Sequence, residues 1–132
     1  MLNTFPGLLT YAFFAPTLLR ITVALTIGYL AYKHYEKRGE IAAARFPVVG
    51  AATWVPWLAI AVELCTMVGL FLGYHTQIFA IIGMLIALKQ AVWSSKYPDF
   101  ILLSRGTAVL LLIILVSIMV TGAGALAFDL PL

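Results

Sequence analysis

The stretch VPWLAIAVELCTMVGLFLG, at residues 55–73, decides the fold of this chain. It contains a single charged residue, Glu63, among apolar and small side chains. A helix that crosses a membrane needs about 20 mostly apolar residues, and an ionised side chain in hydrocarbon is costly unless it has a partner. The stretch therefore predicts a membrane-spanning helix whose glutamate faces other protein segments and not lipid.

Three further apolar stretches, at about residues 15–33, 78–93 and 106–126, fill most of the remaining chain, and a polar connection occupies residues 34–53. Hydrophobic residues make up 64% of the 132 residues and charged residues 10%. In a water-soluble globular protein, roughly a quarter of all residues are charged. We therefore expect an all-α integral membrane four-helix bundle that forms one domain over residues 1–132.

The basic residues are distributed unequally between the two ends of the predicted spans. The first and third connections, with the span ends beside them, carry Lys33, Lys37, Arg38, Arg45, Lys89, Lys96 and Arg105. The N-terminal segment, the turn at residues 74–77 and the C-terminal tail have no lysine or arginine. Because cationic loops stay cytoplasmic, both termini should lie on the outer side, and we expect the cytoplasmic membrane of a prokaryote. Basic loops at membrane ends do not indicate a nucleic-acid partner.

Arg20 is the second ion inside an apolar span. It lies on one helical stripe with Ala24 and Gly28, and Glu63 lies on a stripe with Gly73. At 1.5 Å per residue, Arg20 should lie roughly 8 Å and Glu63 about 15 Å below the outer membrane face, a difference that an arginine side chain can bridge. We expect an Arg20–Glu63 ion pair in a buried polar core.

Asp129, just beyond the fourth span, is a second candidate partner for Arg20 and completes the expected polar core. Two interpretations of this core remain open. It either fixes which helices pack together, or it binds a ligand or passes protons, since intramembrane ions are candidates for functional sites.

Small residues predict where the helices approach one another, because helix contacts in membranes depend on small side chains and polar groups. The candidates for helix packing occur on the first three spans and are Ala24, Gly28, Gly69, Gly73, Gly83 and Ala87.

The chain has no residue pattern for catalysis by itself. Ser–His–Asp sets, HExxH, P-loops and dinucleotide-binding motifs are absent from the sequence, and a lone cysteine, Cys65, excludes an intrachain disulfide. His34 in the polar connection and His75 in the outer turn should lie at opposite membrane faces, so they cannot ligate one haem. We therefore expect no catalytic residue, no metal site and no cofactor bound by this chain alone.

A set of aromatic and polar residues could still surround a quinone or lipid head group. Its members are Trp57, Thr66, His75 and Trp93. The expected partners are membrane lipids, and either other membrane subunits or a second copy of the chain.

Several short motifs resemble the DoxX family of small four-span membrane proteins. Leu19-Arg20 with Gly28 and Lys33-His34 is similar to the pattern of the first helix in that family. Glu63-Leu64, the segment GLFLGY at residues 69–74 and Thr76 resemble the pattern of the second helix, and Ala87 fits the third. The tail TGAGALAFD at residues 121–129 resembles the terminal motif of the family, with Ala123 and Ala127 at positions where proline and serine are usual.

The resemblance implies a four-helix bundle associated with quinone-linked membrane redox systems. It suggests a non-catalytic or quinone-associated subunit of a respiratory or redox complex, so any activity would belong to a quinone-linked oxidoreductase complex. It also carries over Arg20, Glu63 and Asp129 as the polar core. The alternative is a small-solute, ion or proton carrier or channel that uses the Arg20/Glu63 centre, and a free-standing enzyme ranks last.

Overall fold

The computed structural model describes residues 11–43, 53–93, 102–124 and 126–128. Every regular element in these ranges is a helix: α1 (Phe14–Glu36), α2 (Arg38–Ala43), α3 (Val55–Leu72), α4 (Thr76–Trp93) and α5 (Arg105–Thr121). The prediction of an all-helical chain is confirmed for these residues. Three helices, α1, α3 and α4, are long and apolar enough to cross a membrane, and α5 is an apolar helix of 17 residues.

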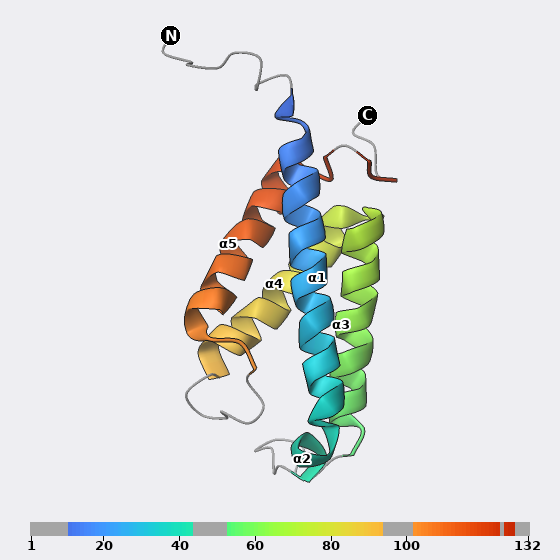
Figure 1. Ribbon diagram of the computed structural model, residues 1–132, viewed down its shortest axis with the longest axis vertical. Coiled ribbons are helices and arrows are strands. Elements are labelled where there is room, and N and C mark those ends of the chain that lie inside the picture. The colour runs from blue at the N-terminus through green and yellow to red at the C-terminus, as the bar shows by residue number, and fades with distance from the viewer. Residues whose placement is uncertain (1–10, 44–52, 94–101, 125, 129–132) are drawn as a thin grey trace.

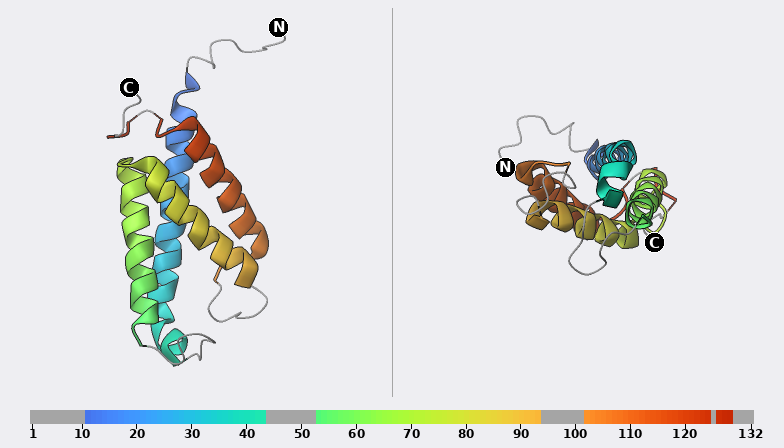
Figure 2. Two further views of the ribbon diagram at one scale, coloured as in Figure 1. Left: turned by 180° about the vertical axis from the view of Figure 1, so that it is seen from behind. Right: turned by 90° about the horizontal axis from the view of Figure 1, so that it is seen from below.

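The helices form a bundle in which α1 packs along α3, and α4 packs along α5 (Figure 1). The start of α1 and the end of α5 lie at one end of the bundle, which we call the terminal end, and α2 lies at the opposite end, the α2 end (Figure 1). Helices α3 and α4 meet at the terminal end and diverge toward the α2 end (Figure 2). This divergence lets α1 contact both helix pairs.

The tight return between α3 and α4 depends on Gly73. This residue adopts the left-handed conformation (φ 68°), and its N–H donates to the carbonyls of Gly69 and Leu70. Glycine favours this conformation because it has no Cβ. A Cβ at Gly73 would also collide with the Arg20 guanidinium and lie 2.7 Å from the Ala127 Cβ. The sequence therefore needs glycine here both for the turn and for the close approach of α1 and the C-terminal segment.

The apolar core lies in the middle of the bundle and is made by α1, α3, α4 and α5. Its buried members are Val23, Ala24, Ile27, Leu70, Ala80, Ala87, Leu111, Leu115 and Ile118. Small residues occur where helices come closest, as packing in membranes requires. An added Cβ at Gly28 would lie 2.5 Å from the Met67 sulfur of α3, and one at Gly69 would overlap the Phe79 ring of α4. Gly83 admits Leu115 of α5.

Two helix ends differ from the expected spans. Helix α1 continues to Glu36 and α2 follows after one residue, so His34 is in the last turn of α1. The prediction that His34 lies in a loop is therefore wrong. Helix α5 ends at Thr121, where Gly122 has a positive φ of 82°, several residues before the expected end at residue 126. Asp129 lies outside the described residues.

Candidate functional site

Glu63 is the centre of a buried polar cluster in the half of the bundle nearer α2. Its carboxylate is 1% exposed, and its Oε2 accepts a hydrogen bond of 2.7 Å from His34 Nδ1. The His34 ring is fully buried as well. Helix α1 presents His34 inward because the residue continues the buried stripe of Ala24, Ile27 and Ala31. The hydrogen bond therefore joins α1 to α3 at a point where neither side chain reaches water.

Helix α4 contributes Lys89 to the same carboxylate. The Lys89 Nζ lies 3.8 Å from Glu63 Oε1, and the Lys89 side chain is 24% exposed. At this distance the contact is an ion pair without a direct hydrogen bond. The cluster thus brings a carboxylate, an ammonium and an imidazole together from three helices, and the lysine partly opens it to the surroundings.

Gln90 follows Lys89 and lies on the buried face of α4, in register with Gly83 and Ala87. Its side chain is fully buried, and neither its Nε2 nor its Oε1 has a hydrogen-bond partner. Glu63 Oε1 also accepts no hydrogen bond. A buried polar group without a partner costs roughly 1–3 kcal/mol. The Gln90 amide and Glu63 Oε1 could therefore still form hydrogen bonds with a ligand.

Arg20 is buried at the opposite end of the bundle. Its side chain is 1% exposed, and it donates to the carbonyl of Ala123 at 2.5 Å and to that of Leu126 at 3.1 Å. The guanidinium thus holds the segment after α5 against α1 and the end of α3. The predicted Arg20–Glu63 ion pair is therefore wrong, because the two side chains have different partners in different halves of the bundle.

The error came from the relative level of the two helices. The prediction placed the outer ends of α1 and α3 at one height, whereas α1 extends beyond the end of α3 (Figure 1). As a result, Arg20 lies level with Gly73 at the end of α3. Ten residues separate Gly73 from Glu63 along α3, or about 15 Å. This distance exceeds the reach of an arginine side chain.

The predicted quinone environment is not one site in this structure. Trp57, at the α2 end, is exposed and makes an edge-on contact with Tyr35. His75 is in the turn at the terminal end, against the Tyr74 ring, and most of the length of α3 (Val55–Leu72) separates it from Trp57. Thr66 is buried, and its hydroxyl donates to the Val62 carbonyl of its own helix. Thr66 lies one turn of α3 from Glu63, and Trp93 lies one turn of α4 beyond Gln90.

Sequence reasoning missed two members of the cluster, His34 and Lys89, and it also missed the buried amide of Gln90. Two of them could have been found from helical spacing. Residues 20, 24, 27, 31 and 34 follow alternating steps of four and three, and all are buried; residues 83, 87 and 90 do the same on α4. Extending each stripe of small residues by one step therefore reaches His34 and Gln90. Lys89 lies beside the stripe, and nothing in the spacing indicated its contact with Glu63.

Within the described residues, no group of three histidine, cysteine, aspartate or glutamate side chains is placed to hold a metal ion. The cluster can donate hydrogen bonds, accept them, and carry a proton on three different groups. Comparison of the chain with protein-family models, with curated proteins and with solved structures finds no match.

Removing either partner of the buried His34–Glu63 bond should destabilise the bundle, because the other partner is left buried without compensation. We expect Glu63→Leu or His34→Leu to cost about 3–5 kcal/mol each, and the double variant to cost less than their sum. Reversible unfolding in mixed detergent micelles, followed by tryptophan fluorescence, measures these values. The matched cycle pairs Arg20→Leu with Glu63→Leu. The free-energy changes of these two variants should add within about 0.5 kcal/mol. Coupling between Arg20 and Glu63 without coupling between His34 and Glu63 would contradict the arrangement.

Arg20 should determine how tightly the segment after α5 is held. Arg20→Met removes both hydrogen bonds to the Ala123 and Leu126 carbonyls, so backbone amides of residues 122–124 and 126–128 should exchange faster with deuterium. Arg20→Lys keeps a charge but cannot reproduce the two-pronged contact, and we expect intermediate exchange. Amides of the Glu63 cluster serve as the internal control and should not change. Equal acceleration at both ends of the bundle would show that Arg20 acts on the fold as a whole.

Proposed function

We propose that the chain is a DoxX-type integral membrane protein that acts as a non-catalytic, quinone-associated subunit of a membrane redox complex. The observation that carries this proposal is the Glu63 carboxylate, which is 1% exposed and lies between His34 of α1 and Lys89 of α4. Ionisable side chains inside membrane helices are candidates for functional sites by default. The motifs that resemble the DoxX family supply the redox context.

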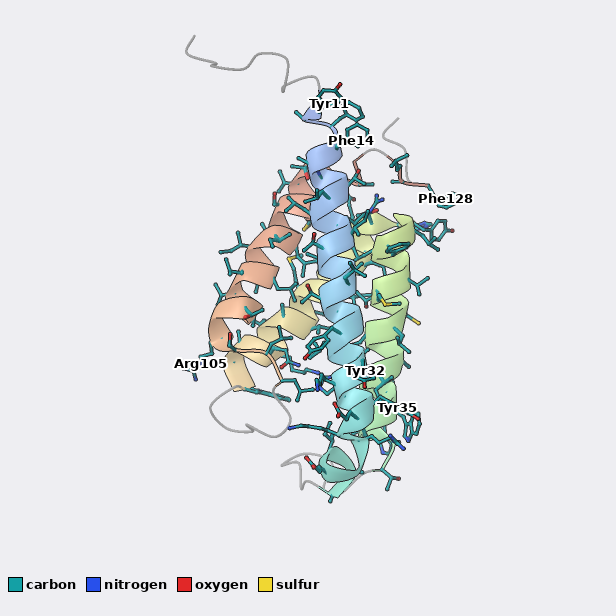
Figure 3. The ribbon with its side chains drawn as sticks, in the orientation of Figure 1. Tyr11, Phe14, Tyr32, Tyr35, Arg105 and Phe128 are labelled. Atoms are coloured by element: carbon teal, nitrogen blue, oxygen red, sulfur yellow. The ribbon has the colours of Figure 1, made fainter. Side chains whose placement is uncertain are left out.

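Aromatic residues support the membrane placement. At membrane–water interfaces, tyrosine and tryptophan are enriched at the level of the head groups. Exposed aromatic residues occur in two groups: Tyr29, Tyr32, Tyr35, Trp54, Trp57 and Trp93 in the half of the bundle nearer α2, and Tyr11, Phe13, Phe14, Phe71, Tyr74 and Phe128 at the terminal end. Figure 3 shows representatives of both groups. Between them, the outer surfaces of the helices carry exposed leucine, isoleucine and valine, as lipid contact requires.

In the proposed topology α1, α3, α4 and α5 all cross the cytoplasmic membrane of a prokaryote, and both termini lie outside. The support is the charge asymmetry of the sequence. Among the described residues, Lys33, Lys37, Arg38 and Arg105 lie toward the α2 end, and Arg20, the one lysine or arginine toward the terminal end, is buried. The α2 end should therefore face the cytoplasm.

A carrier or channel with one Arg20/Glu63 centre fits the geometry less well. The two ions lie in opposite halves of the bundle, and the apolar core around Ile27, Leu70 and Leu115 lies between them. A polar path that used both side chains would have to cross this core. The described residues thus favour a binding site at one level over a route through the bundle.

The subunit proposal predicts that the chain copurifies with quinone and with partner proteins after extraction in a mild detergent. Mass spectrometry of the lipid extract and of the intact complex measures both. The Glu63→Gln variant should reduce the quinone content, because the variant loses the charge that holds His34 and Lys89. The control Gln77→Leu, which alters an exposed residue of α4, should leave it unchanged. A chain that purifies alone and free of quinone would overturn the proposal.

The topology predicts opposite accessibility for the two ends of the bundle. In a Cys65→Ala background, Tyr11→Cys should react with a membrane-impermeant maleimide added to intact cells, whereas Glu40→Cys in α2 should react only after the membrane is opened. The reverse pattern would place the termini inside the cell.

A further inference from the structure

The buried amide of Gln90 also indicates which kind of ligand could bind. The side chain is fully buried, its Nε2 has two N–H groups to donate, its Oε1 can accept, and neither atom has a hydrogen-bond partner. Glu63 Oε1 is a further buried acceptor without a hydrogen bond. Lys89, the residue before Gln90 on α4, has its Nζ 3.8 Å from that oxygen. The buried faces of α3 and α4 near Lys89 therefore carry a neutral donor together with neutral and charged acceptors.

This combination discriminates between ligand heads. A carbonyl oxygen only accepts, so it can satisfy Gln90 Nε2 and leaves both acceptor oxygens without a partner. A hydroxyl accepts from Nε2 and also donates to Gln90 Oε1 or to Glu63 Oε1. An ammonium head only donates and would enter beside Lys89, which repels it. Among these heads, the hydroxyl alone meets both needs of the site.

We infer that the Gln90–Glu63 level binds the reduced, hydroxyl-bearing form of a membrane-soluble quinone in preference to the oxidised form. The inference rests on the proposed quinone association and specifies which redox form the protein holds. Trp93 lies one turn beyond Gln90 on α4 and is 42% exposed, so its indole can contact the ring of the ligand. The step is binding only, and no electron or proton transfer is required of this chain.

The test compares the two redox forms of a benzoquinone with a decyl tail, using the protein in nanodiscs under nitrogen. Partition between protein-loaded and empty nanodiscs, read by chromatography, gives both affinities. We expect the quinol to bind about tenfold more tightly than the quinone, since the quinone lacks the donor that the buried acceptors need. Gln90→Leu should abolish this preference, and Gln77→Leu, which alters an exposed amide on the same helix, should preserve it.

Folding of the test variant is checked independently. Gln90→Leu removes a buried amide that has no partner, so the thermal midpoint of this variant without ligand should be no lower than that of the wild type. If Gln90→Leu does not fold, Gln90→Met is used in its place. Equal affinity for the two forms, or tighter binding of the quinone, would overturn this inference and leave the quinone-associated function standing. A quinol preference that survives the Gln90 substitutions would also overturn it, because the site would lie elsewhere. Binding of neither form would overturn both proposals.

Discussion

The hydrogen bond between His34 and Glu63 is the constraint on which the rest of the structure depends. A carboxylate that is 1% exposed in an apolar bundle needs a donor, and His34 Nδ1 supplies it at 2.7 Å. This need fixes the register of α1 against α3, because sliding either helix by one residue would turn one of the two groups away from the other. Lys89 then ties α4 to the same point. Three helices are therefore held at one level by one acid.

The remaining architecture follows from separating this level from the second buried ion. Arg20 is held at the terminal end by backbone carbonyls of the segment after α5, and the apolar core fills the space between the two centres. At Gly28, Gly69 and Gly83 the neighbouring helix lies so close that side chains such as Met67, Phe79 and Leu115 occupy the space of a Cβ. Arg20 thus holds the segment after α5 on the bundle. The buried Gln90 amide keeps unused hydrogen-bonding capacity.

Much of this was predictable from the sequence. Apolar length placed the helices, and the charge of Arg20 and Glu63 within apolar stretches indicated that both would be buried, as they are. The identity of the partners was not predictable in the same way. Two opposite charges look complementary in a sequence, but whether they pair depends on the relative height of their helices. The prediction set the outer ends of α1 and α3 at the same height, whereas α1 extends beyond α3 (Figure 1). Arg20 donates to backbone carbonyls. Because every residue has a backbone carbonyl, the sequence does not indicate which of them accept from Arg20.

Solid-state NMR in lipid bilayers tests the central arrangement most directly. Dipolar recoupling between a ¹³C-labelled Glu63 carboxyl carbon and ¹⁵N-labelled histidine measures their separation in the membrane itself. A hydrogen bond of 2.7 Å to His34 Nδ1 predicts a carbon–nitrogen distance of about 3.5 Å. No measurable coupling to His34, together with strong coupling of the carboxyl carbon to the ¹⁵N-labelled guanidinium of Arg20, would contradict the account.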